Sequence, residues 1–221
     1  NAPRAAILQR FFKTGPGEYG AGDVFLGLPV PQQRRVALHF AALPAAHIQR
    51  LLRSGIHEER LVALFILVRQ FERGDRPTRE RSVRLYLDNL RHVNNWDLVD
   101  LSAPRLLGAW LSDRKRDLLY RLAHSQNLWE RRIALLATMH FIRQDEFEDT
   151  LALVAQLLAD REDLIHKAAG WMLREVGKRH LASLEEFLDQ YHARMPRTML
   201  RYAIERLPAA QRQHYLGRPP A

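Results

Sequence analysis

The stretch EERLVALFIL, residues 58–67, decides the class of fold. It begins with charged residues and continues with apolar residues spaced three and four apart, which is the period of one face of an α-helix. The apolar series is Leu61, Leu64, Phe65, Val68 and Phe71. The pattern predicts an amphipathic helix.

Similar stretches recur about every 35 to 37 residues. They are WDLVDLSA around Asp97, WERRIALLAT around Arg132 and IHKAAGWMLR around Lys167. Each begins polar and becomes apolar, and each is predicted to be the second helix of a pair. This period is typical of a HEAT-type solenoid, in which stacked helix pairs form a superhelix with a concave groove. We therefore predict an all-α, HEAT-like helical-repeat solenoid, with residues 1–221 forming a single domain.

The remaining pattern is helical almost throughout, and we expect about a dozen helices of 10 to 18 residues. No stretch alternates polar and apolar residues over the length of a strand, so no sheet is expected. Pro31, Pro77 and Pro196 are predicted in first turns, and Asn127 is a predicted N-cap.

The segment KTGPGEYGAGD, residues 13–23, is predicted to be an exposed loop. Its GPGEYG matches the three-glycine pattern of dinucleotide-binding turns. That interpretation is rejected, because no strand precedes the glycines and no helix begins within them.

The composition is strongly basic. Lys and Arg total 34 against 25 Asp and Glu, which gives a formal net charge of +9 at pH 7 and a pI near 10.4. Most of these residues are arginines, whose guanidinium suits bidentate contacts with phosphate. Such an excess is typical of proteins that bind polyanions, so we expect a nucleic-acid partner and a basic groove. The alternative is a basic protein without a polyanionic partner.

Several classes of protein are disfavoured. No apolar run approaches the roughly 20 residues of a membrane span, and no signal-peptide pattern is visible. Cysteine is absent, which excludes disulfides and fits a reducing cytoplasm. The ten histidines form no metal-ligand pattern, since HEER at His57 lacks the second histidine of a zinc protease motif. His140 and His166 are interpreted as structural. We expect neither a metal nor a cofactor.

The stretch NNWDLVD, residues 94–100, interrupts the apolar pattern. With Asn94 or Asn95 as the cap, Trp96 and Asp100 fall on one helical face, four residues apart.

The two aspartates of this stretch are predicted to lie in different environments. Asp97 lies in the first turn, where a carboxylate complements the helix dipole. Asp100 lies beside apolar residues, where a carboxylate needs a partner or a function, and Arg132 is a candidate partner. Trp129 is interpreted as a core residue.

Four stretches resemble the AlkD family of bacterial DNA alkylation repair glycosylases. They are FLGLPVPQQRR (25–35), NNWDLVD (94–100), LWERRIALL (128–136) and HKAAGWMLREVGK (166–178), in the order found in the family. The resemblance implies a HEAT-like fold and a monofunctional DNA glycosylase. Such enzymes hydrolyse the N-glycosidic bond of cationic N3- and N7-alkylated purines in duplex DNA without flipping the base into a pocket. It also implies a monomer of the bacterial cytoplasm whose partner is double-stranded DNA with alkylated bases.

The resemblance also implies roles for single residues. Asp100 matches the catalytic aspartate, Trp96 and Trp171 match the two groove tryptophans, and Arg132 matches the arginine that grips the DNA backbone. Where the family often has WWD, this chain has Asn95 at the first position.

Other basic and aromatic residues are expected to contact DNA. Arg131 and Lys167 are expected among the phosphate-binding residues. Tyr19 is the nearest candidate for an aromatic residue that the family has in the N-terminal part of the groove.

Two alternatives stay open. A non-catalytic relative would bind damaged or branched DNA through the same groove, and a HEAT-type scaffold would bind a protein. The presence of Asp100 with both tryptophans argues against the first alternative, and the basic charge argues against the second.

Overall fold

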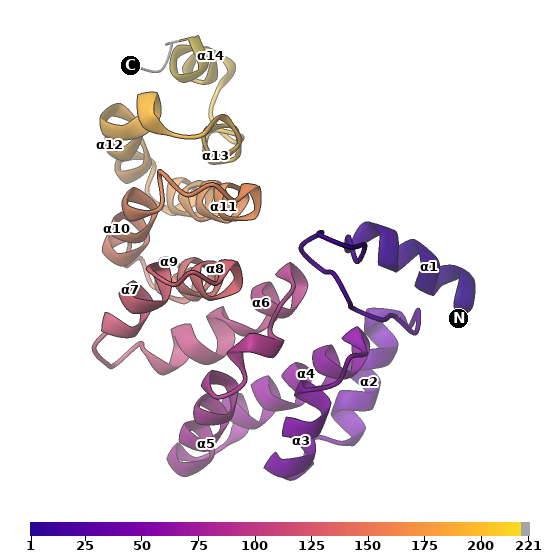
Figure 1. The fold of residues 1–221 in the computed structure, drawn as a ribbon. Helices are drawn as coiled ribbons and strands as arrows, with labels where there is room; N and C mark the ends of the chain where they lie inside the picture. The colour runs from indigo at the N-terminus through magenta and orange to yellow at the C-terminus, as the bar shows by residue number, and fades with distance from the viewer. Residues whose placement is uncertain (218–221) are drawn as a thin grey trace. The chain divides into compact units, whose positions relative to one another are not determined.

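The structure is a computed structural model that describes residues 1–217, in which the chain divides into two compact units. The first unit is Asn1–Trp110 and the second is Leu111–Ala221. All regular elements of the described residues are helices, as Figure 1 shows, and Val24 and Ile56 form only an isolated bridge. The predicted all-α class is therefore confirmed.

The first unit is built around its longest helix, α4. Its helices are α1 (Ala2–Phe11), α2 (Val30–His39), α3 (Ala45–Leu52), α4 (His57–Arg73), α5 (Arg76–Leu87) and α6 (Trp96–Ser102), with short turns η1 (Leu90–His92) and η2 (Pro104–Gly108). Helices α2, α3, α5 and α6 all pack against α4. Residues 63–68 of α4 are consequently all buried.

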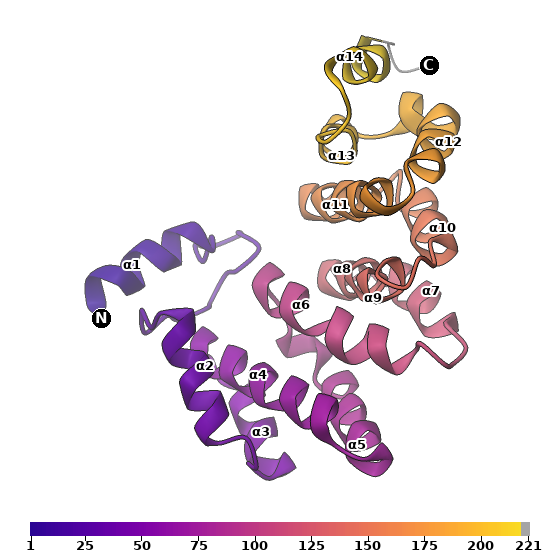
Figure 2. The ribbon, with the colours of Figure 1, turned by 180° about the vertical axis from the view of Figure 1, so that it is seen from behind.

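The second unit consists of stacked helices. They are α7 (Asp117–Ala123), α8 (Leu128–Ala137), α9 (Met139–Ile142), α10 (Glu148–Gln156), α11 (Asp163–Arg179), α12 (Leu181–Tyr191), η3 (His192–Arg194), α13 (Arg197–Ala203) and α14 (Ala209–Gly217). Figures 1 and 2 show two layers, with α8, α11 and α13 in one and α7, α10 and α12 in the other. This is the layering expected of a helical repeat.

The recurrent stretches of the sequence occupy α4, α6, α8 and α11. Helix α3 packs against α4, α7 against α8, and α10 against α11. For these three pairs the stretch does form the second helix, as predicted.

The predicted helix boundaries are partly confirmed. Pro31 and Pro77 lie in the first turns of α2 and α5, and Asn127 caps α8 by accepting a hydrogen bond from the Trp129 N–H. Pro196, however, is the residue before α13 and not part of its first turn.

Several helices are shorter than the expected 10 residues. Helices α6, α7 and α13 have 7 residues each. Helix α6 ends at Ser102, just before Pro104, whose ring nitrogen cannot donate the next helical hydrogen bond. Helices this short depend on tertiary packing for stability, and the apolar period does not reveal their length.

Gly170 allows α11 and α13 to approach closely. A Cβ atom at this position would lie 2.4 Å from the Met199 backbone oxygen and 2.5 Å from the Tyr202 Cβ. A side chain here would therefore force the two helices apart.

We expect Gly170→Ala to lower the free energy of unfolding by about 1–2 kcal/mol, because overpacking outweighs the gain in helix propensity. Urea denaturation followed by circular dichroism measures the change. Gly55→Ala is the control, since a Cβ there meets nothing within 4 Å. Equal stability of both variants and the wild type would show that α11 and α13 separate without cost.

Candidate functional site

Helix α6 begins at a buried asparagine cap. The side-chain oxygen of Asn95 accepts a hydrogen bond from the Trp96 backbone N–H at 2.9 Å, and Asn95 is fully buried. The Asn95 backbone oxygen accepts the first helical bond, from the Val99 N–H. Of the two asparagines considered as caps, Asn95 is therefore the N-cap of α6. The cap fixes the start of α6 and places Trp96 in its first turn.

Trp96 and Asp100 lie one helical turn apart on α6, and both are half-buried. Residues at this spacing share a helical face, as the sequence predicts. At the other end of α6, the buried Ser102 hydroxyl donates to the Leu98 backbone oxygen at 2.6 Å and lies 3.1 Å from the Tyr86 hydroxyl. Both ends of this short helix are thus held by buried hydrogen bonds.

The Trp96 indole packs against the end of α1. Its ring stacks on Phe12 with a centroid separation of 5.1 Å and an interplanar angle of 13°. Phe11 contacts the same indole edge-on at 6.0 Å. Phe12 is itself buried and stacks on Phe25 at 5.0 Å. The orientation of the indole therefore depends on residues that precede the glycine-rich loop.

The loop of residues 13–23 lies against the start of α6. A Cβ atom on Gly20 would be 2.4 Å from the Phe12 backbone oxygen and 3.2 Å from the Asn95 side-chain nitrogen. Only a residue without a side chain fits here. The close approach also explains Asn95 itself, because an indole at that position would displace the loop. Tyr19, directly before Gly20, is half-buried.

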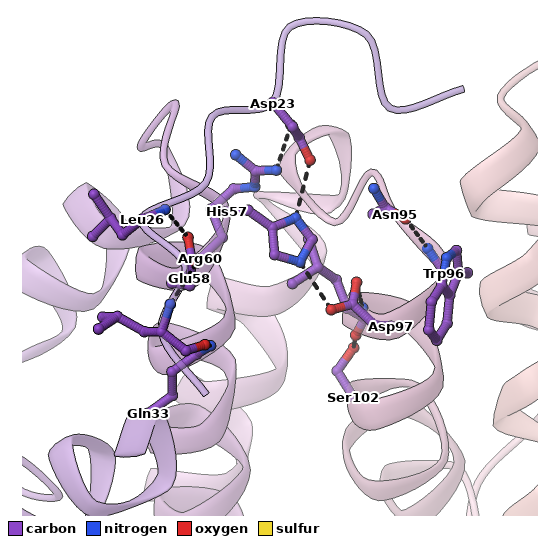
Figure 3. Close-up of polar contacts among 12 residues, drawn as sticks. Asp23, Leu26, Gln33, His57, Glu58, Arg60, Asn95, Trp96, Asp97 and Ser102 are labelled. Carbon is purple, nitrogen blue, oxygen red and sulfur yellow. Dashed lines mark hydrogen bonds and ion pairs between the residues drawn. The ribbon is translucent and has the colours of Figure 1, made fainter. Parts of the chain in front are cut away.

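A buried ionic network joins the loop to both α4 and α6 (Figure 3). The His57 ring lies between two carboxylates, with Nδ1 3.0 Å from Asp23 Oδ2 and Nε2 2.8 Å from Asp97 Oδ2. Arg60 Nη2 donates to the other oxygen of Asp23 at 2.6 Å. Asp97 also accepts from the Leu98 N–H at 2.9 Å. Its place in the first turn is confirmed, and its bond to His57 is a second role.

The network shifts the pKa values of its members. Burial by itself would lower the pKa of His57, but the hydrogen bonds to Asp23 and Asp97 outweigh burial and raise the pKa above its usual value. Burial would raise the pKa of Asp23, but the hydrogen bonds from His57 and Arg60 outweigh it and lower that pKa. Both shifts favour the charged forms.

A second buried carboxylate holds the segment that follows the loop. The two oxygens of Glu58 accept the backbone N–H groups of Leu26, Gly27 and Leu28 at 3.0, 2.8 and 3.2 Å. Gly27 has a φ of +78°, a conformation that favours glycine. The first turn of α4 thus binds the last part of the non-helical stretch between α1 and α2, from Asp23 to Leu28.

In the second unit, Trp171 lies half-buried on α11. Its indole N–H donates to Glu175 Oε1 at 3.1 Å, and Lys178 Nζ lies 2.6 Å from the same oxygen. The indole borders a hollow of about 370 Å³. The hollow is lined by Met139, Ile142, Arg143, Trp171, Glu175, Lys178 and Arg179.

The predicted DNA-binding basic residues of the second unit all have protein contacts. Arg132 is only 5% exposed and donates to the Leu164 backbone oxygen at 2.6 Å, which joins α8 to α11. Arg131 forms an ion pair with Asp160 at 2.6 Å. Lys167 is more accessible and pairs with Asp163 one turn earlier, at 2.7 Å.

The predicted site residues are distributed over both units. The first unit carries Tyr19, Trp96 and Asp100, and the loop and α6 bring these into one region. The second unit carries Trp171, Arg131, Arg132 and Lys167, all on α8 and α11.

Three members of the buried network, His57, Arg60 and Asp23, are not predicted from the sequence. The signal for His57 was its spacing, since it lies four residues before Leu61 and therefore on the apolar face of its helix. A titratable residue on a buried face needs a partner.

Asp23 was missed because the loop of residues 13–23 was predicted to be exposed. That prediction is wrong at the end of the loop, where Asp23 is only 5% exposed. The glycine-rich pattern of the loop does not indicate that it ends in a buried carboxylate.

Other predictions concern single residues. Trp129 is buried, as expected for a core residue. His166 Nε2 hydrogen-bonds to the Asp160 backbone oxygen at 2.6 Å, and His140 Nε2 contacts Gln144, both of which fit structural roles. Within residues 1–217, no group of three or more histidine, aspartate or glutamate side chains is placed to hold a metal ion. No described helix has the length and apolarity to cross a membrane.

Comparisons with known proteins identify the fold and the family. A solved structure described as a predicted DNA alkylation repair enzyme from Enterococcus faecalis superposes with a TM-score of 0.72 at 18% identity. The match covers 95% of this chain and 97% of that one, which establishes the same fold. A comparison with curated proteins found no match. The sequence model of the DNA alkylation repair enzyme family matches residues 1–207. Because that match spans nearly the whole chain, the protein belongs to the DNA alkylation repair enzyme family.

Proposed function

We propose that this chain is a monofunctional DNA glycosylase that removes cationic N3- and N7-alkylated purines from double-stranded DNA without flipping the base into a pocket. The observation that supports this most directly is the pair Trp96 and Asp100, one turn apart on α6. The start of that helix is held by the buried Asn95 cap and by the Asp97–His57 bond. Side chains on a rigid element can be held at the position that catalysis requires.

The chemistry needs few groups. A purine alkylated at N3 or N7 is already positively charged and leaves as a neutral base, so no general acid has to protonate it. The sugar develops oxocarbenium character, and one ionised carboxylate next to it stabilises the charge and orients the attacking water. We assign this role to Asp100. The indoles of Trp96 and Trp171 would favour the cationic sugar through their ring faces.

The remaining residues would hold the duplex. We propose that Arg131, Arg132 and Lys167 contact phosphates and that Tyr19 contacts the DNA from the loop. The net charge of +9 supports a basic, phosphate-binding groove. Phosphate contacts position a duplex without reading its sequence, which suits a repair enzyme. We propose that residues 1–221 act together as one monomeric domain in the bacterial cytoplasm, without a metal or a cofactor.

The decisive experiment uses duplex DNA with a single 7-methylguanine. The protein is incubated with this duplex, and the released base is measured against incubation without protein. Release of free 7-methylguanine supports the glycosylase. Tight binding of the duplex without release would instead support the non-catalytic alternative.

The proposed phosphate contact of Arg132 makes a prediction about salt. Each phosphate neutralised by the protein releases counterion, so log affinity falls with log salt by about 0.9 per contact. We expect Arg132→Ala to make this slope shallower by about one unit for undamaged and damaged duplex alike. Binding titrations at several salt concentrations measure the slope.

Arg132→Lys is the matched control, because it keeps the charge and should keep the slope. Arg132 also donates to the Leu164 oxygen, so both variants need a thermal melt to show that they are folded. A folded Arg132→Ala variant with the wild-type slope would mean that Arg132 does not contact a phosphate.

A further inference from the structure

The His57 ring is held at both nitrogens. Nδ1 lies 3.0 Å from Asp23 and Nε2 lies 2.8 Å from Asp97, and the His57 side chain is only 2% exposed. A neutral imidazole carries one N–H and can donate to only one carboxylate, whereas an imidazolium donates to both. With both carboxylates ionised, this geometry favours the imidazolium, which carries a proton on each nitrogen.

The charges around the ring balance only in that state. Asp23 reaches it from the loop, Asp97 from α6, and Arg60 binds Asp23 from the same helix as His57. With His57 protonated, two positive groups face two negative groups. Loss of the proton would leave a net negative charge in a buried place, which is unfavourable.

The remaining neighbours of the ring add no compensating charge. Phe25 stacks on His57 at 4.4 Å, and Phe12 packs at 5.0 Å. The adjacent Glu58 is engaged by the backbone N–H groups of residues 26–28.

When His57 loses its proton, Asp23 and Asp97 are affected differently. Asp23 keeps its 2.6 Å bond to Arg60 whatever the state of His57, and its side chain is 4% exposed. Asp97 is 17% exposed and would keep only the local bond to the Leu98 N–H. Water can reach Asp97 more easily than Asp23, so we expect the His57–Asp97 hydrogen bond to break while the packing of α6 against α4 remains.

We propose that His57, as an imidazolium, is a positioning residue that fixes the start of α6 to the loop of residues 13–23, and that loss of its proton frees the start of α6 from His57. The catalytic consequence rests on the proposed glycosylase function, because α6 carries Trp96 and Asp100. Two routes connect His57 to this pair. Asp97 is the chain neighbour of Trp96, and Phe12 packs on both the His57 ring and the Trp96 indole.

The direction of the pH effect follows from the raised pKa of His57, which results from its bonds to Asp23 and Asp97 prevailing over burial. The stabilisation is fully present below the pKa of His57 in the unfolded chain, about 6.5. It is lost as the pH rises through the higher pKa of the folded protein.

The experiment compares three proteins between pH 6 and pH 9. Single-turnover release of 7-methylguanine is measured for the wild type, Asp97→Asn and His57→Gln, with spontaneous release subtracted. We expect the wild-type rate to fall by roughly tenfold to a hundredfold as pH rises, because small displacements of a catalytic group are costly. The amide introduced by Asp97→Asn can donate to a neutral Nε2 while Nδ1–H donates to Asp23, so that profile should be flat. His57→Gln removes the positive charge, and both of its N–H donors lie on one nitrogen instead of on two sides of a ring, so its rate should be low at every pH.

Hydrogen exchange provides a readout that does not depend on catalysis. The amides of α6 should lose protection in the wild type as pH rises, after correction for the intrinsic pH dependence of exchange. Helix α5, in the same unit, is the internal reference. If the wild type shows this loss but never releases the base, the proposed function fails and the role of His57 stands.

Two results would overturn the inference. One is protection of α6 that is independent of pH in the wild type and equal in His57→Gln. The other is a pH profile of Asp97→Asn that falls as steeply as that of the wild type.

Discussion

Asp100→Asn is expected to reduce the release of 7-methylguanine by roughly a hundredfold or more while leaving DNA affinity nearly unchanged. The substitution keeps the shape of the side chain and removes its charge. Two unit charges about 4 Å apart gain about 4 kcal/mol at an effective dielectric of about 20, which corresponds to roughly a thousandfold in rate. In bulk water the same pair gains only about 1 kcal/mol. The half-buried position of Asp100 places it between these limits.

Single-turnover rates with saturating protein measure the effect, and binding is titrated in parallel. Asp88→Asn is the matched control, since Asp88 is an exposed carboxylate of the same unit. It removes the same charge from the protein and should leave the rate within about twofold, because exposed charges are well screened. An Asp100→Asn variant that releases the base at the wild-type rate would remove Asp100 from the mechanism.

The second large effect concerns the leaving base. The proposed mechanism has no general acid, so a base that must be protonated before it leaves should be a poor substrate. General acid catalysis contributes about 10²–10⁴ to such reactions. We expect the release of uracil or hypoxanthine to be at least about a hundredfold slower than the release of 7-methylguanine or 3-methyladenine.

Matched duplexes that differ only in the lesion test this selectivity. The same sequence context carries 7-methylguanine, 3-methyladenine, hypoxanthine or uracil, and each released base is quantified by chromatography. Efficient uracil release would require a group that protonates or stabilises the leaving base, and the mechanism proposed here would then be wrong.

Much of the fold could be predicted from the sequence, because the relevant signals are local. The spacing of Leu61, Leu64 and Phe65 reports the period of a helix, and Asn127 stands where a cap is needed. The lengths of α6 and α13 could not be predicted, because packing decides how many residues a short helix keeps. Pro196 shows the limit of boundary prediction, since a proline fits both the first turn and the position before it.

The site was predictable only in part. The spacing of Trp96 and Asp100 on one face follows from the helix period and the Asn95 cap. The pairing of His57 with Asp23 and Asp97 joins residues 34 and 40 positions apart, and no local pattern records such a contact. The roles of Trp171 and Arg132 still rest on the family resemblance.

The first turn of α4 has a consequence for the order in which the chain folds. His57, Glu58 and Arg60 bind a segment that begins at Asp23 and lies more than 30 residues earlier in the sequence. Such contacts stabilise the fold only after the intervening chain has been closed into a loop, and loop closure costs conformational entropy. We therefore expect them to form late. Helix α4 must therefore exist before the N-terminal segment can dock on it. Phe12 lies still earlier in the chain and stacks on Trp96, so this contact closes a longer loop, and we expect it to be among the last contacts of the first unit to form.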